Sequence, residues 1–419
     1  MDTREKLLKL RNETWNNAAE CIMPFWRDYT VDHEYGGFYG SVNKDLKPVE
    51  GDVKSLVLNT RMLWGFTNAY DLLGDEKYAD NARRSFDYIL EHFWDKEYGG
   101  VYYMISHDGK PLSCDKRMYG QACFLYAAAE FYYVFKDQRA LDYIHETLRL
   151  MDTYTMSPLG AYRDYSNRRW DHDLWLDAPY TRRLDGSYSL NCHLHMFESL
   201  TLIYKSTKDP AMGKRMRDML LLILDHMIEY DRGHLKAAMD ADCNRTDNEI
   251  NFGHDLECAY LMMDAAEMLG EPELIKRVQD VVVTFANKAV EEGMDPIDGA
   301  MNAEMNLATG ESDRAKIWWV ECESISGILC AYEICRDEKL LDAVISIWEY
   351  VKKHMLCEDG IEWYGLGTHE DDFGPNQTEI WWTELFGGIT NKSNRIKCPY
   401  HNSRAMFGAA QRIDRILGA

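Results

Sequence analysis

The stretches "DHEYGGFY" (residues 32–39) and "DKEYGGVY" (residues 95–102) repeat almost the same eight letters 63 positions apart. Two glycines flanked by aromatic residues are typical of a tight turn between two short strands. Weaker forms of this turn recur around Gly160, Gly233, Gly299 and Gly360. Counted from Gly37 through Gly100, the intervals are 63, 60, 73, 66 and 61 residues. Six turns at nearly equal spacing indicate a repeated architecture.

Two kinds of helical pattern lie between the turns. Segments 74–93, 209–230, 270–290 and 336–355 place apolar residues at three- and four-residue steps among charges, which is typical of helices with one solvent-facing side. Segments 56–73, 118–135, 251–269 and 317–334 are rich in Ala, Met, Leu and aromatic residues and poor in charge, as expected of buried helices.

These patterns predict an all-α fold, an (α/α)6 barrel that forms one domain over residues 1–419. Six buried helices form the inner ring, six amphipathic helices surround it, and short β-hairpins connect them at one rim. An open helical solenoid of the tetratricopeptide type is the alternative, but its repeats are shorter, about 34 to 47 residues.

Composition restricts the partners. A formal net charge of −23 argues against nucleic acid or an anionic membrane as a partner, since both require a basic face. Eleven cysteines without CxxC pairs indicate reduced thiols. No apolar run approaches the length of a membrane span, and "MDTREKLLKL" has no apolar signal region. We therefore expect a cytoplasmic monomer or homodimer that acts on a small molecule.

Unusual polar and aromatic residues concentrate where each buried helix begins. In chain order they are Arg61; Tyr119; Asn191, His193 and His195; His254 and Glu257; Trp318, Trp319 and Glu323; and His401 and Arg404. The beginnings of the inner helices lie at the same end of an α/α barrel, so these side chains are expected to converge on one pocket. Burying charge without a function costs several kcal/mol per ion, which favours a functional site. His193 is two residues from its neighbours, faces elsewhere, and is interpreted as structural.

This set of residues suits a neutral polyol that must exchange protons. Histidine titrates near neutrality, arginine stabilises negative oxygen, and tryptophan offers a flat apolar face to a sugar ring. Zinc bound by His195, His254 and His401 is possible in principle, but no HExxH pair supports it. No GxGxxG or P-loop motif is present either, so we expect neither metal nor cofactor.

Five motifs carry a family resemblance: "NTRMLW", "LNCHLH", "GHDLE", "KIWWVECE" and "KCPYHNSR". Together they resemble the N-acylglucosamine 2-epimerase superfamily, and most of all its cellobiose 2-epimerase branch, from about Pro24 to the C-terminus. The resemblance implies a cofactor-independent (α/α)6 barrel that interconverts glucose and mannose configurations at a reducing end.

The resemblance also implies residue roles. His254 and His401 match the two histidines that act as acid and base on opposite faces of the sugar, through a cis-enediol. His195 matches a third histidine that assists ring opening, and Arg61 matches the arginine that stabilises the enediolate, with Tyr119 and Asn191 nearby. The remaining matches are Glu257 and Glu323, which orient the histidines, Arg404, which supports His401, and Trp318 and Trp319, which form a sugar-stacking wall.

One position departs from the family pattern. Ile396 stands where the cellobiose 2-epimerases carry a tryptophan before "KCPYH", and the longer preceding loop contains Trp381 and Trp382, either of which could replace that ring. The substrate therefore stays open between a β-linked disaccharide such as cellobiose, mannose and an N-acylhexosamine, and aldose–ketose isomerisation is a further alternative. Two alternatives of other classes are a glycoside hydrolase using Glu257 and Glu323 and a non-catalytic helical scaffold.

Overall fold

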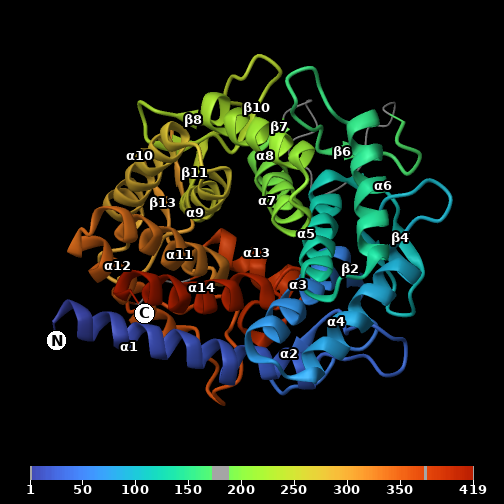
Figure 1. Ribbon diagram of the computed structural model, residues 1–419. Helices are drawn as coiled ribbons and strands as arrows, with labels where there is room; N and C mark the ends of the chain where they lie inside the picture. Colours follow the sequence, from blue (N-terminus) through green and yellow to red (C-terminus); the bar gives the residue numbers. More distant parts are fainter. Residues whose placement is uncertain (1, 172–187, 372–374, 419) are drawn as a thin grey trace.

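The computed structural model describes residues 2–171, 188–371 and 375–418 (Figure 1). Its helices are α1 (Thr3–Asn16), α2 (Met23–Tyr29), α3 (Leu56–Leu73), α4 (Glu76–Tyr88), α5 (Met118–Phe135), α6 (Gln138–Tyr154), α7 (Leu190–Thr207), α8 (Pro210–Leu222), α9 (Phe252–Leu269), α10 (Pro272–Lys288), α11 (Trp318–Cys335), α12 (Glu338–His354), α13 (Gln377–Phe386) and α14 (Pro399–Leu417). Short π-helical turns occupy Asn17–Ile22, Ile89–Phe93, Ile223–Met227 and Ala289–Gly293, and a 3₁₀ turn occupies Gly388–Thr390.

The helices form two concentric rings (Figure 1). Helices α3, α5, α7, α9, α11 and α14 contact one another in that order, and α14 returns to α3, which closes the inner ring. Outer helices α4, α6, α8, α10 and α12 each pack on the inner helix that precedes them in the chain. The fold is thus the expected (α/α)6 barrel, and ring closure rules out the open solenoid.

The sixth outer helix comes from the other end of the chain. Helix α1 packs along α14, and Figure 1 shows the two termini close together. Arg11 of α1 donates two hydrogen bonds to Asp414, and Trp348 of α12 donates its indole N–H to Glu13 at 2.7 Å. The repeat pattern alone does not show this pairing, because the two helices of the last pair are separated by nearly the whole sequence.

Burial distinguishes the two rings as the sequence pattern predicts. In α5 the residues Ala127, Ala128 and Ala129 are all fully buried, so this helix has no solvent-facing side there. In α4 the buried residues include Tyr78, Ala82 and Phe86, at four-residue steps along one side. Among the described residues, no helix is long and apolar enough to cross a membrane.

Short antiparallel strands form the rim. They are β1 (Val42–Asn43), β2 (Lys54–Ser55), β3 (Met104–Ile105), β4 (Pro111–Ser113), β5 (Lys116–Arg117), β6 (Tyr165–Ser166), β7 (Tyr188–Ser189), β8 (Ile228–Glu229), β9 (His234–Leu235), β10 (Ala238–Met239), β11 (Glu249–Asn251), β12 (Glu304–Asn306), β13 (Ser312–Asp313) and β14 (Asn391–Ser393). Strands β2, β5, β7 and β11 run directly into α3, α5, α7 and α9. The pairing of each with a strand of the next repeat fixes those helix beginnings at one rim.

The repeated turn motif is explained by its first residue. Asp95 accepts backbone hydrogen bonds from Glu97 and Tyr98, and its other oxygen binds Lys116 at 3.1 Å, where both side chains are fully buried. The pairs Asp32–Lys54 and Asp295–Lys316 repeat this arrangement at 2.7 and 3.1 Å. Each lysine lies two residues before an inner helix, so the turn is joined to the rim. Gly100 has φ +68°, and a Cβ there would lie 2.5 Å from the Trp170 ring, which explains a glycine at this position.

A second repeated contact joins each turn to its helix. The fourth residue of an inner helix accepts a backbone N–H of a hairpin: Val101 to Gln121, Tyr162 to His193, Leu235 to Asp255 and Met301 to Glu321, at 2.9–3.1 Å. We call these four acceptors the hairpin caps. His193 also bonds Ser189 O through Nδ1 at 2.7 Å, which confirms that it is structural and faces away from His195.

Two other histidines of the rim are held by carboxylates. His234 of the β8–β9 hairpin is buried between Asp255 and Glu292, and His369 lies between Asp298 and Glu379. Burial opposes a charge on His234, but its bonds to Asp255 and Glu292 raise its pKa above the ordinary value. His172 lies outside the described residues.

Candidate active site

The predicted residues meet where the inner helices begin. His254 and His401 are the third residues of α9 and α14, and both rings contact the ring of Trp319, with centroids 4.9 and 6.0 Å away. Gly253 permits this approach, because a Cβ there would lie 2.5 Å from the Trp319 ring. Both imidazoles therefore contact the ring of one tryptophan at the rim where α9, α11 and α14 begin.

His401 is held by a carboxylate of the neighbouring inner helix. Its Nδ1 lies 2.5 Å from Glu323 Oε1, and the second oxygen of Glu323 accepts the hydroxyl of Tyr260 at 2.7 Å. Because a carboxylate can only accept, Nδ1 carries the proton and donates it. Nε2 is then left as the basic nitrogen of the neutral ring.

Arg404 joins three carboxylates from three inner helices. Its Nη2 donates to Glu323 at 2.9 Å and contacts Glu257, and its Nη1 donates to Glu198 at 2.9 Å. All three carboxylates are at least 96% buried, so the shared guanidinium offsets part of the cost of burying them together. Arg404 thus supports His401 through Glu323. Glu257 pairs with Arg404, and no hydrogen bond between Glu257 and His254 is present in the described chain.

His195 and Arg61 form the opposite part of the cluster. His195 Nδ1 bonds Glu198 at 3.0 Å, and its Nε2 lies 3.4 Å from Arg61 Nη2. Arg61 donates from Nε to Tyr126 at 2.8 Å, and its guanidinium lies over the Tyr400 ring, 4.4 Å from the centroid. The arginine is 1% exposed, so its charge acts in a dry environment where it is weakly screened.

Burial keeps the three imidazoles neutral. It lowers the pKa of His195 to about 3, lowers that of His401 well below its usual value, and lowers that of His254 as well. Arg61 and Arg404 lower the pKa of His401 further by repelling a second positive charge. Neutral imidazoles at pH 7 can accept a proton, and the buried arginines favour negative charge on a nearby oxygen.

Five predicted residues are neither fully buried nor exposed: Tyr119, Asn191, His254, Trp319 and Arg404. The Tyr119 ring contacts His195 at 5.2 Å. The cluster thus has a dry side, formed by Arg61, His195 and Glu323, and a side that solvent reaches. A ligand would enter from the second side.

Trp318, Trp381 and Trp382 continue the site outwards. Trp318 is fully buried, its ring lies 6.3 Å from His401, and Trp382 of α13 packs against it edge-on at 5.3 Å. Trp381 is the exposed member, with 43% of its surface accessible. Ile396 packs against the core and offers no ring.

The donor set of the candidate site does not favour a bound metal. Glu257, Glu323 and His401 place ligand atoms within 4.8 Å of one another, but Arg404 already contacts both carboxylates, and its charge would repel a cation. The same proximity argues against the hydrolase alternative. Hydrolases separate their two carboxylates by roughly 5.5 Å or more on either side of the sugar bond, whereas these two share one guanidinium nitrogen.

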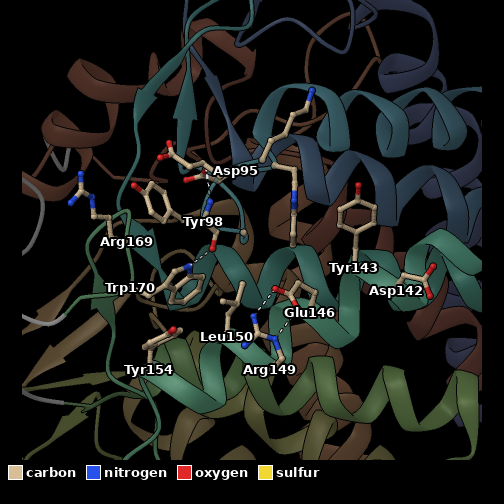
Figure 2. A pocket seen from close by; sticks show the side chains of 14 residues that line it. Asp95, Tyr98, Asp142, Tyr143, Glu146, Arg149, Leu150, Tyr154, Arg169 and Trp170 are labelled. Atoms are coloured by element: carbon tan, nitrogen blue, oxygen red, sulfur yellow. Dashed lines mark hydrogen bonds and ion pairs between the residues drawn. The ribbon is translucent and has the colours of Figure 1, made fainter.

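A separate cavity of about 570 Å³ lies at the rim between residues 94–99 and α6 (Figure 2). Aromatic side chains, including Tyr98, Tyr143 and Trp170, line it, and the ion pair of Glu146 and Arg149 lies at its edge. None of the predicted site residues contributes to its described lining. The cavity is therefore not the candidate active site.

Sequence reasoning missed several members of the network, namely Glu198, Tyr126, Tyr260 and Tyr400. Glu198 could have been predicted from the sequence, because His195 and Glu198 have the same i,i+3 spacing as His254 and Glu257. The tyrosines carry no comparable signal, since Tyr is common throughout this chain, which contains 26 of them. Only their position in the barrel identifies them.

Comparisons with known proteins identify the family of this chain. The sequence model of the N-acylglucosamine 2-epimerase (GlcNAc 2-epimerase) family matches residues 16–380. Cellobiose 2-epimerase of Bacteroides fragilis is 30% identical over 401 residues, covering 94% of this chain and 97% of that protein. The Ruminococcus albus enzyme of the same name is 31% identical over 397 residues, covering 94% and 96%. The structure of cellobiose 2-epimerase from Bacillus thermoamylovorans matches with a TM-score of 0.86 and 28% identity, covering 96% of this chain and 99% of that one.

Proposed function

We propose that this chain, which belongs to the N-acylglucosamine 2-epimerase family and is a carbohydrate epimerase, interconverts the glucose and mannose configurations at the reducing end of a β-linked disaccharide such as cellobiose. The observation that carries the proposal is the contact of both His254 and His401 with Trp319. Inversion at one carbon without redox chemistry requires two proton-transfer groups, one for each face.

The proposed reaction begins with the open-chain aldose. One of the two imidazoles removes the C2 proton, and the electron pair of the broken C–H bond moves into the C1–C2 bond to give a cis-enediolate. After rotation about C2–C3, the other imidazole returns a proton to the opposite face of C2. Arg61 stabilises the negative oxygen, and His195 assists ring opening and holds the C1 oxygen. Tyr119 and Asn191 contact the sugar beside them.

The residues around His401 tune this transfer. Glu323 holds the imidazole through Nδ1, so Nε2 faces the reaction as a base, and it stabilises the imidazolium that forms. Arg404 fixes Glu323 and Glu257 in place. Trp319, which contacts both histidines, provides the sugar-stacking face, and the buried Trp318 packs against His401.

Incubation with cellobiose in buffered D2O tests the proposal. Deuterium should enter C2 and mannosyl-glucose should accumulate, without added metal or nucleotide. Replacement of either histidine, His254→Ala or His401→Ala, should reduce inversion by roughly 100- to 10,000-fold, since positioned acid–base groups contribute that much. Circular dichroism would confirm that both variants fold.

The exposed His145 of α6 provides a matched control, and His145→Ala should leave the rate unchanged. Other products would redirect the assignment. A ketose as the main product would indicate aldose–ketose isomerisation through the same enediolate. Release of glucose from cellobiose would indicate a hydrolase. No exchange with any aldose would refute the proposal.

A further inference from the structure

The last turn of the repeat departs from the motif that other turns share. In three other turns the first residue is an aspartate that pairs with a lysine two residues before an inner helix, as Asp95 pairs with Lys116. The last turn closes with the same kind of backbone hydrogen bond, Cys357 N to Glu362 O at 3.1 Å, but its first residue is a cysteine. Burial raises the pKa of this thiol to about 12, so it is neutral at pH 7 and offers Lys397 no negative charge.

Glu362 supplies the missing carboxylate from the other end of the turn. It occupies the position of Gly37 and Gly100 in the first two turns, and like them it has a positive φ, +66°, which is uncommon for a residue with a side chain. Its side chain is fully buried, and Oε1 binds Lys397 Nζ at 3.1 Å. A strained conformation persists only where the surrounding contacts require it, and such positions concentrate at functional sites.

The same carboxylate takes part in a modified hairpin cap. Asn402 is the fourth residue of α14, the position from which Gln121 of α5 accepts Val101 N directly. In the last repeat Glu362 lies between helix and hairpin, because its Oε1 accepts Asn402 Nδ2 at 2.6 Å and Trp363 N at 2.7 Å. One side chain thus makes the two contacts that an aspartate and a cap divide between them in the second turn.

These contacts lie on both sides of His401 in the chain. Lys397 comes four residues before His401, Asn402 follows it directly, and Glu362 binds both. The second oxygen of Glu362 accepts the indole N–H of Trp26 in α2, and the Trp26 ring lies 5.5 Å from Lys397 Nζ. The beginning of α14 is therefore attached to the last hairpin and to α2 through one buried carboxylate.

We propose that Glu362 is a positioning residue that fixes the first turn of α14, and with it the place of the His401 imidazole during proton transfer at C2. This inference rests on the proposed function. Glu323 holds the imidazole through Nδ1 at 2.5 Å, but the direction of the ring also depends on where its helix begins. A misplacement of about 1 Å can lower the rate of a reaction by about 100-fold.

The presence of two proton-transfer groups separates placement from folding. In D2O, the sugar whose C2 proton is removed by His254 should still form the enediolate in Glu362→Gly, but its inversion requires His401. The ratio of deuterium returned to the same face over inversion should therefore rise about tenfold or more for this sugar. For the epimer whose proton His401 removes, exchange and inversion should fall together. A purely structural loss would lower both processes alike for both epimers.

A second measurement requires no substrate. The imidazole nitrogen signals of His401 in NMR spectra, assigned with His401→Ala, report its tautomer and its bond to Glu323. They should shift in Glu362→Gly and stay unchanged in the control Glu358→Gly, the same substitution at an exposed carboxylate of the same turn. Cys357→Asp combined with Glu362→Gly rebuilds the arrangement of the second turn. This double variant should return both the signals and the exchange ratio towards wild type.

The outcomes separate this inference from the proposed function. In an active enzyme, wild-type signals or a wild-type exchange ratio in folded Glu362→Gly would overturn the inference, and so would a double variant that recovers neither. If Glu362→Gly does not fold, Glu362→Gln, which keeps the shape of the side chain, takes its place in both measurements. Shifted His401 signals in a protein that is inactive towards every aldose would support the positioning of His401 and refute the proposed function.

Discussion

The first turn of each inner helix has two sides with opposite roles, although their residues are neighbours in the sequence. His193 accepts Tyr162 N on the hairpin side, and His195, two residues later, bonds Glu198 inside the barrel. Glu321 and Glu323 repeat this relation on α11, where Glu321 binds Met301 N and Glu323 binds His401. Residue type does not separate a hairpin cap from a site residue, whereas the direction of the side chain does.

The largest difference in turnover should appear between substitutions of His195 and His193, both on α7. His195→Ala should lower turnover about 100-fold or more, because it removes a group placed beside Arg61 and the C1 oxygen. His193→Ala should leave kcat within a few-fold of wild type, measured at a temperature where both variants fold. Wild-type turnover in His195→Ala would contradict the role given to His195. A loss of turnover in folded His193→Ala would contradict the structural role given to His193.

Arg404→Ala should produce the largest loss of stability. It removes the guanidinium that Glu198, Glu257 and Glu323 share, and breaking a buried ion pair costs about 3–5 kcal/mol. Urea unfolding followed by circular dichroism measures this change. The matched control is Arg149→Ala, whose ion pair with Glu146 is exposed and is expected to contribute less than about 1 kcal/mol. Similar losses in both variants would contradict the buried network.

His193→Ala should destabilise the protein by about 1–3 kcal/mol while preserving activity, because it leaves Tyr162 N without its acceptor. The same unfolding measurement applies. A loss below about 0.5 kcal/mol, typical of a surface substitution, would show that the hairpin cap contributes little.

The remaining prediction concerns pH and Glu321. Burial raises the pKa of this carboxyl to about 8, and Lys316 only partly opposes the shift. The native state therefore keeps a proton that the unfolded state releases near pH 4.5, so this group's contribution to stability is complete below that pH and is lost as pH rises towards 8. The expected slope is about 1.4 kcal/mol per pH unit at most.

Glu321→Gln should remove that slope. In the equivalent cap, Gln121 accepts Val101 N and donates to Val101 O, so an amide fits this position. Relative to wild type, the unfolding free energy of the variant should increase from pH 5 to pH 8. A difference that does not change with pH would mean that Glu321 is ionised in the native protein.

Much of the fold could be predicted because its signals are local. Segments 56–73 and 118–135 coincide with α3 and α5, since a charge-poor run bounded by turn residues identifies a buried helix. The outer segments 74–93 and 270–290 correspond to α4 and α10 with their π-helical turns. The pairing of α1 with α14 had no such signal, because neither helix contains information about the other.

For the candidate site, the sequence identified the residues but not their contacts. Arg404, expected beside His401, binds three carboxylates, and Glu198 was missed although it bonds both His195 and Tyr400. A helix position predicts which side a residue faces, yet the partner it meets there depends on how the ring closes.

By itself the sequence determined the period of the turns, the two kinds of helix and the chemical types gathered at the helix beginnings, because helical periodicity and turn chemistry depend on neighbouring residues. The tertiary structure alone decided that Trp319 contacts both His254 and His401, that Arg404 contacts Glu257 across a separation of 147 residues, and that Trp382 packs on Trp318. These contacts form only when the closed ring brings distant helix ends together, and their geometry follows from packing rather than from local preference.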